Sequence, residues 1–183
     1  MPCLVPSNAL IMLVGAAASG KSTWARSCFR DTEVVSSDRC RALVADDEED
    51  QSASPQAFAV FYEILGARAS LGRLGVADST ALHPVARARL REVAARFGVP
   101  HLAVVIAPPV ATLLERNRQR ERRVPDAVVV RQAEWVDGLL REGMLEREGY
   151  DAVLRLEGNE GVRVVPAAEW AAGRPERRAP RGD

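Results

Sequence analysis

Several features that would identify particular classes of protein are scarce in this sequence. Aromatic residues make up only 5% of the 183 residues, which argues against a platform on which several nucleic-acid bases stack. The three cysteines and two histidines lack the spacing of metal ligands, so we interpret the cysteines as reduced thiols of a cytoplasmic protein. No run approaches the roughly 18 apolar residues that span a bilayer, and no basic residue precedes the apolar residues 9–18, as a signal peptide would require.

Net charge is absent as well, because 25 Lys and Arg residues balance 25 Asp and Glu residues. No overall basic field would therefore attract nucleic acid or a membrane surface, and an anionic ligand has to be held by local arginine clusters. Residues 116–123 form such a cluster with five arginines. Lysine is nearly missing: Lys21 is the only one among the 25 basic residues.

The single lysine stands in the segment GAAASGKS at residues 15–22, which fits the phosphate-binding pattern G-x-x-x-x-G-K-[ST]. An apolar run typical of a strand precedes the segment, and a sequence compatible with a helix follows it. The glycines allow a tight turn and bring backbone N–H groups close to phosphates. Lys21 would reach the β- and γ-phosphates of ATP or another NTP, and the Ser22 hydroxyl would ligate Mg²⁺. The candidate nucleotide-binding residues of this loop are Gly15, Ala18, Ser19, Gly20, Lys21, Ser22 and Thr23.

Strand-like and helix-like segments alternate over residues 9–156, which predicts an α/β fold with a parallel sheet and helices on both faces. About five strands are expected, at 9–14, 33–36, 73–80, 101–107 and 150–156, with helices at 21–30, 37–44, 54–72, 84–97, from 109 onward, and 126–147. Residues 1–8 have no periodicity and are expected to be a loose lead-in. Periodicity is also lost after residue 157, and we expect a disordered tail over residues 173–183.

Two strand ends carry charged side chains that could act on a ligand. Ser37 is a plausible N-cap, so Asp38 lies in the first turn of a helix and Arg41 follows three residues later on the same face. Asp78 ends the third strand, shortly before Thr80, and could reach a Mg²⁺ shell, although a strand-end Asp that caps a turn fits the spacing equally well. The acidic residues 46–50 are interpreted as a solvated loop.

Arg116 and Arg120 are four residues apart, so a helix would stack them on one face, with Arg123 close by. Like charges at this spacing repel each other unless an anion lies against them. The pattern predicts a phosphate-facing lid, and a solvated arginine face is the alternative.

These segments together resemble the polynucleotide 5′-hydroxyl kinases, the phage and bacterial enzymes that phosphorylate broken DNA or RNA ends. Besides the phosphate loop, the resemblance rests on VVSSDRCR (34–41), ADDEEDQ (45–51), LGRLGVADST (71–80) and ERNRQR (115–120), in the family's order. It implies a P-loop kinase domain over residues 1–157, dependent on ATP and Mg²⁺, and a C-terminal extension over 158–183. It also implies a DNA or RNA 5′-OH end as the acceptor.

The resemblance further implies a role for each matching residue. Asp38 would accept the proton of the attacking hydroxyl, and Arg41 would hold the phosphate on the 3′ side of the acceptor nucleotide. Asp78 matches the family's acid at the third strand end, and Ser37 and Thr80 flank these two carboxylates. Lys21, Ser22, Arg116 and Arg120 match the residues that bind the donor phosphates.

The sequence departs from the family at two positions, with Ala81 where Asn is frequent and Ala18 where Gly is common. Bacterial relatives also carry phosphatase or ligase domains. The alternatives are a kinase of a nucleoside or another small-molecule hydroxyl, or a nucleotide-binding regulatory module without transfer chemistry. Oligomeric state is left open.

Overall fold

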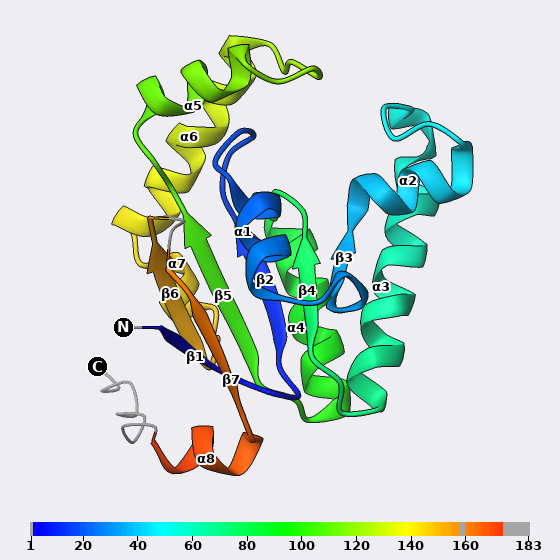
Figure 1. Cartoon of the computed structure of the whole chain (residues 1–183), viewed down its shortest axis with the longest axis vertical. Coiled ribbons are helices and arrows are strands. Elements are labelled where there is room, and N and C mark those ends of the chain that lie inside the picture. Colours follow the sequence, from blue (N-terminus) through cyan, green and yellow to red (C-terminus); the bar gives the residue numbers. More distant parts are fainter. Residues whose placement is uncertain (1, 158–159, 174–183) are drawn as a thin grey trace.

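The computed structural model describes residues 2–157 and 160–173. Its main sheet has five strands in the order β3-β4-β2-β5-β6. All neighbouring pairs are parallel, which confirms the predicted sheet (Figure 1). The strands are β2 (Leu10–Val14), β3 (Val34–Ser36), β4 (Gly75–Asp78), β5 (His101–Ile106) and β6 (Ala152–Leu156).

The first strand of this sheet in the chain, β2, lies at its centre. Leu10 pairs with Gly75 of β4 on one side and with His101 of β5 on the other, and all five residues of β2 are buried. The chain therefore continues to opposite sides of β2 in its later strands. In open α/β sheets a ligand binds at such a switch point, outside the carboxyl ends of the strands.

Seven helices accompany this sheet in the described residues, and the two faces carry separate cores. They are α1 (Lys21–Cys28), α2 (Ser37–Ala45), α3 (Ser54–Ser70), α4 (Pro84–Phe97), α5 (Val110–Arg118), α6 (Asp126–Arg141) and α7 (Met144–Arg147). Phe61 of α3 and Leu90 of α4 pack on the face that includes Met12. Trp24 of α1 packs on the opposite face, with Ile11. The alternation of Ile11 and Met12 between the two cores is the period of two that a strand imposes.

The predictions of a loose lead-in and of an irregular region after residue 157 are wrong. Cys3–Pro6 form β1, which pairs in parallel with β7 (Val162–Val165), and α8 (Ala167–Ala172) follows. Val5 is buried in the second core, and Trp170 of α8 packs against that core. Four-residue strands are too short for a periodic pattern, which explains the error. The remainder of the predicted disordered tail, residues 174–183, lies outside the described residues.

Three local boundaries differ from the prediction. The N-cap of α2 is Ser36 and not Ser37, since the Ser36 Oγ accepts a hydrogen bond from the Arg39 N–H at 3.3 Å. Helix α5 ends at Arg118, so Arg120 lies in the following turn. The helix expected over 126–147 is interrupted by Gly143, whose φ of +60° separates α6 from α7. Among the described helices, none combines the length and the apolar character needed to cross a bilayer.

Candidate active site

The phosphate-binding loop joins β2 to α1, and its two glycines occupy positions that other residues would not tolerate. A Cβ atom at Gly15 would lie 2.5 Å from the Ile106 carbonyl oxygen and 2.8 Å from the Ser19 Oγ. Gly20 is the N-cap of α1 and has a φ of +97°, in the region where a side chain is strained. The sequence therefore produces a compact loop at the positive end of a helix.

Ala18 adopts a φ of +62° in the same loop. For a residue with a Cβ atom, this left-handed conformation costs roughly 1–2 kcal/mol. Glycine avoids this cost, which gives a physical reason why the resembling sequences often have glycine here.

The Lys21 ammonium lies inside the loop. Its Nζ donates hydrogen bonds to the carbonyl oxygens of Gly15 and Ala16, both at 2.9 Å, and the residue is 7% exposed. Burial lowers the pKa of Lys21 to about 8, with a further lowering by Arg120, while Asp78 and Asp38 act in the opposite direction. A bound phosphate would stabilise the charged ammonium in place of the hydration that burial removes.

Asp78 and Ser22 form the part of the site that suits a divalent cation. Asp78 is buried at the end of β4, where loss of hydration raises its pKa, and a hydrogen bond from Ser22 and the charge of Lys21 oppose this rise. A hydroxyl and a carboxylate are the oxygen ligands that Mg²⁺ accepts, and Mg²⁺ takes its other ligands from phosphates and water. These residues therefore fit the ion. Elsewhere in the described chain, no cluster of three His, Cys, Asp or Glu side chains could hold a metal.

Thr80 and Thr23 lie at the rim of the loop. Both are exposed, and the Thr80 carbonyl oxygen accepts a long hydrogen bond of 3.5 Å from the Gly15 N–H.

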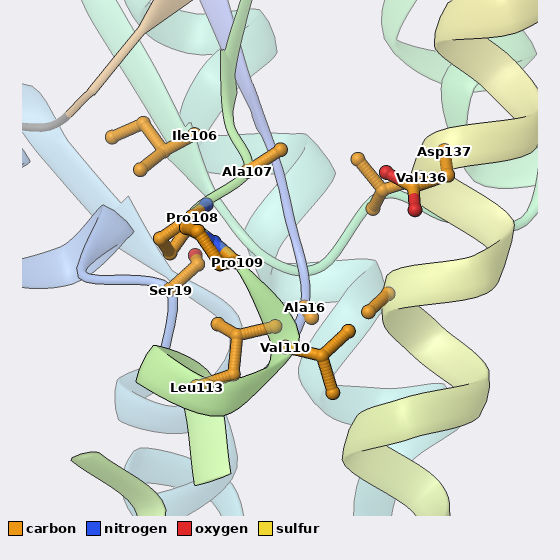
Figure 2. Close-up of a pocket in the computed structure, with 11 residues that line it drawn as sticks. Ala16, Ser19, Ile106, Ala107, Pro108, Pro109, Val110, Leu113, Val136 and Asp137 are labelled. Carbon is orange, nitrogen blue, oxygen red and sulfur yellow. The ribbon is translucent and has the colours of Figure 1, made fainter. Parts of the chain in front are cut away.

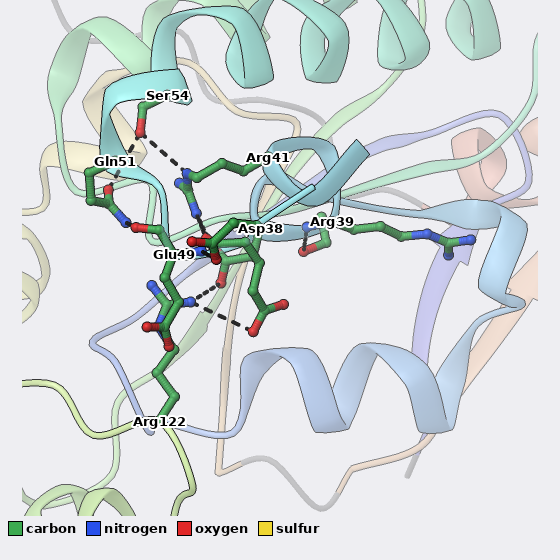
Figure 3. Close-up of polar contacts among 10 residues, drawn as sticks. Asp38, Arg39, Arg41, Glu49, Gln51, Ser54 and Arg122 are labelled. Carbon is green, nitrogen blue, oxygen red and sulfur yellow. Dashed lines mark hydrogen bonds and ion pairs between the residues drawn. The ribbon is translucent and has the colours of Figure 1, made fainter. Parts of the chain in front are cut away.

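A second group of polar side chains lies on and around the first turn of α2 (Figure 3). Arg41 is 4% exposed. Its Nη1 donates to Asp38 Oδ1 at 2.8 Å and to the Glu48 carbonyl oxygen at 2.6 Å, and its Nε donates to the Ser54 Oγ at 3.3 Å. The Asp38 side chain is half exposed, at 49%, while Ser37 is buried. Asp38 is therefore the more accessible of these two side chains.

The three lid arginines named from the sequence differ in their relation to the phosphate loop. The Arg116 Nη1 donates to the Ser19 carbonyl oxygen at 3.1 Å, and the charge of Arg120 acts on Lys21. Arg123 instead lines a separate hollow with Arg118 and Asp126. The structure thus brings Arg116 into contact with the loop, gives Arg120 an electrostatic effect on Lys21 alone, and leaves Arg123 away from the loop.

Sequence reasoning missed the residue that shapes the lid. Asn117 is 1% exposed. Its Nδ2 donates to the Val124 carbonyl oxygen at 2.6 Å and to Asp126 Oδ1 at 3.1 Å, and its Oδ1 accepts from the Val124 N–H at 3.1 Å. Asn117 therefore closes the turn that carries Arg120 and Arg122. The available signal was an Asn between two arginines in an otherwise charged run.

Gln132 of α6 and Arg122 were also missed. The Gln132 Oε1 accepts a hydrogen bond of 2.8 Å from the Ala17 N–H of the phosphate loop, and no motif pointed to it. Arg122 forms ion pairs with Asp38, Glu48 and Glu49. The acidic residues 46–50 are therefore more than a solvated loop, because two of them face a lid arginine.

A cavity of about 170 Å³ lies between the phosphate loop and the helices α5 and α6. Ala16 and Ser19 line it from the loop, and Leu113 and Val136 line it from the helices (Figure 2). Asp137 is its only charged lining residue, so the cavity does not suit a phosphate.

A glycine-rich loop at a helix N-terminus, an acid at the neighbouring strand end and an arginine lid over a parallel sheet define a P-loop kinase fold. The chain belongs to the AAA domain family AAA_33, whose profile matches residues 10–139. A search of curated proteins found no match.

Solved structures share this fold at low sequence identity. In the Pnkp1/Rnl/Hen1 RNA repair complex, the similar chain has a TM-score of 0.64 and 18% identity, and the match covers 75% of this chain and 47% of that one. This chain therefore spans about half the length of that relative. A gluconokinase from Sinorhizobium meliloti has a TM-score of 0.53 and 19% identity, with coverage of 90% and 88%. The APS kinase CysC from Mycobacterium tuberculosis, solved with AMPPNP and APS, has a TM-score of 0.50 and 17% identity, with coverage of 82% and 90%.

Proposed function

We propose that this protein is an ATP- and Mg²⁺-dependent kinase that transfers the γ-phosphoryl group to the 5′-hydroxyl of a DNA or RNA end. The observation that carries the proposal is geometric. The lid arginine Arg116 donates a hydrogen bond to the Ser19 carbonyl oxygen of the phosphate loop at 3.1 Å, and Arg122 of the following turn lies 3.6 Å from the half-exposed Asp38 carboxylate. The lid therefore lies against both the phosphate loop and an accessible acid, and phosphoryl transfer needs both beside the same phosphate.

The donor half of the reaction uses the loop and the lid. Lys21 and the N-terminal N–H groups of α1 hold the β- and γ-phosphates, and Arg116 and Arg120 stabilise the charge on the transferred group. When bound, Mg²⁺ would be held by Ser22 with Asp78 beside it, and would neutralise charge on the β- and γ-phosphates.

The acceptor half uses Asp38 and Arg41. Asp38 accepts a hydrogen bond from the acceptor hydroxyl and aims its oxygen at the γ-phosphorus. The new P–O bond forms as the bond to the β-phosphate oxygen breaks, ADP leaves, and the hydroxyl proton passes to Asp38 and then to water. Because the transition state is loose, orientation by Asp38 matters more than its basicity.

The Nη2 nitrogen of Arg41 supports a nucleotide as the acceptor. Its Nε and Nη1 bond to Ser54, Asp38 and Glu48, whereas the hydrogen bonds of the described residues include none from Nη2. This nitrogen would donate to the phosphate on the 3′ side of the terminal nucleotide.

A second candidate is a kinase of a small-molecule hydroxyl. The gluconokinase and APS kinase structures match over nearly their whole length, while the RNA repair chain matches over about half. The same residues would act on the donor, and Arg41 would bind another anion or keep only its internal partners.

Phosphorylation with radiolabelled ATP decides between these acceptors. The panel contains a nucleoside, a 3′-nucleotide, short DNA and RNA with 5′-hydroxyl ends, and gluconate. The proposal expects the 3′-nucleotide or an oligomer to be a better acceptor than the bare nucleoside, and it fails if no such preference is seen. Asp38→Asn should abolish transfer while ATP binding is retained, and normal turnover would remove Asp38 from its assigned role.

A further inference from the structure

Arg122 links the lid to the acceptor side of the site. It lies in the turn that follows α5, and Figure 1 shows this turn extending toward the end of α2. Its Nε lies 3.2 Å from Glu49 Oε1, and its Nη1 lies 3.6 Å from Asp38 Oδ2 and 3.9 Å from Glu48 Oε1. Figure 3 shows the side chain approaching Asp38 from the side opposite Arg41.

These contacts leave neither oxygen of Asp38 free of an arginine. Oδ1 accepts from Arg41 at 2.8 Å, while Oδ2 pairs with Arg122 at 3.6 Å. Arg41 is buried and also donates to the Ser54 Oγ and the Glu48 carbonyl oxygen, so its withdrawal from Asp38 would break two further hydrogen bonds. Arg122 is more exposed than Arg41, and its contact with Asp38 is longer. An entering hydroxyl can therefore replace Arg122 at Oδ2 more easily than it can replace Arg41 at Oδ1.

We infer that Arg122 is an autoinhibitory latch. In the ligand-free protein it ties the lid to the acidic residues Glu48 and Glu49 and covers Asp38, and an acceptor hydroxyl displaces it from Asp38. The inference rests on the proposed function in one respect, the use of Asp38 by the acceptor. The ion pairs with Glu48 and Glu49 do not depend on that assignment.

The latch is weak enough to open during a catalytic cycle. The carboxylates of Asp38, Glu48 and Glu49 are 49%, 56% and 59% exposed, and ion pairs at such positions contribute little each. Their loss should change the fraction of open lid by about three- to tenfold, and added salt should have the same effect because it screens exposed charges.

Limited trypsin digestion tests the latch without any activity measurement. Glu49→Gln removes the closest carboxylate and keeps every arginine, so cleavage within residues 116–123 should become about two- to fivefold faster than in the wild type. Asp46→Asn is the matched control. It removes a neighbouring charge for which no ion pair is found in the described residues, and Asn tolerates the φ of +56° at this position. Equal cleavage rates for Glu49→Gln and the wild type would overturn the latch.

Kinetics of Arg122→Ala test whether the latch competes with the acceptor. The KM for the acceptor should fall about three- to tenfold, with kcat and the KM for ATP unchanged, because a competing group has been removed. Arg118→Ala removes an exposed arginine from the same lid and should leave all three values unchanged. A rise in acceptor KM would show that Arg122 binds the acceptor, and would overturn the latch.

The two experiments separate failure of the latch from failure of the proposed function. If no acceptor in the panel is phosphorylated by the wild type, the proposed function fails, and the trypsin comparison alone decides whether Arg122 holds the lid. If the wild type phosphorylates an acceptor and Glu49→Gln digests like the wild type, the latch fails and the proposed function stands.

Discussion

Replacing His101 with phenylalanine should stabilise the protein and remove part of its sensitivity to acid. His101 begins β5, is 5% exposed, and its ring lies 4.6 Å from that of Tyr150 between centroids. Within the described residues, neither ring nitrogen has a hydrogen-bond partner. Burial lowers the pKa of His101 to about 4, and Arg91 lowers it further, against weaker opposing effects of Asp151 and Glu148.

The direction of the pH effect follows from this lowered pKa. The unfolded chain binds a proton with a pKa near 6.5 and the folded chain only near 4, so stability is lost as the pH falls between these values. The loss is about 2 kcal/mol at pH 5 and about 3 kcal/mol near pH 4. The buried unpaired nitrogens add a cost of roughly 1–3 kcal/mol that is independent of pH in the neutral range. Phenylalanine keeps a planar aromatic ring at this position, is somewhat larger than histidine, and carries neither penalty.

Urea unfolding of the wild type and His101→Phe at pH 7.5, 6 and 5 measures both effects. The variant should be about 1–2 kcal/mol more stable at pH 7.5, and its advantage should grow by about 2 kcal/mol at pH 5. Other titrating groups such as Glu148 act in both proteins and cancel in the difference. Any change in packing caused by the larger phenyl ring would alter the stability difference by the same amount at all three pH values. An advantage that stays the same at all three pH values would refute the lowered pKa.

Two further substitutions test the donor side of the site. Arg116→Ala should lower kcat by about 10³-fold or more because lid arginines stabilise transferred charge, and rapid-quench turnover within tenfold of the wild type, with ATP bound normally, would contradict this role. Ala18→Gly should raise the free energy of unfolding by about 0.5–1 kcal/mol, since relief of the positive φ exceeds the added freedom of the unfolded chain. The melting temperature should rise by about 1–4 °C in a thermal scan. A lower melting temperature for Ala18→Gly would show that the positive φ of Ala18 carries no strain that glycine relieves.

The donor half of the molecule could be predicted from sequence because its signals are local. The phosphate loop, the strand before it and the helix after it are contiguous, and strands buried on both faces, such as β5, appear as continuous apolar runs. The sheet and the position of Lys21 follow from such segments. The pairing of β1 with β7 could not be predicted, because Val5 and its partner Val164 are far apart in the chain and each strand has only four residues.

The burial of charged side chains could not be predicted either, because their partners are also distant in the chain. Arg87 was one arginine of an Arg-rich helix, yet it is 1% exposed. Its guanidinium bonds to Glu148, 61 residues later, and to the carbonyl oxygens of Ala81 and Leu82. A pattern of apolar residues cannot indicate that a charged side chain will turn inward to a distant partner. Breaking such a pair would leave a buried charge uncompensated.

The two sides of the site therefore have different physical origins. The phosphate loop is made by backbone, through Gly15, Gly20 and the N-terminal end of α1, and within the loop only Lys21 adds charge. The acceptor side is made by side chains from distant segments, since Asp38 is held between Arg41 of its own helix and Arg122 of the lid. A substitution in the lid that moves Arg122 should therefore change the affinity for the acceptor more than the affinity for ATP. A lid variant with the reverse effect would show that the two sides are not separable in this way.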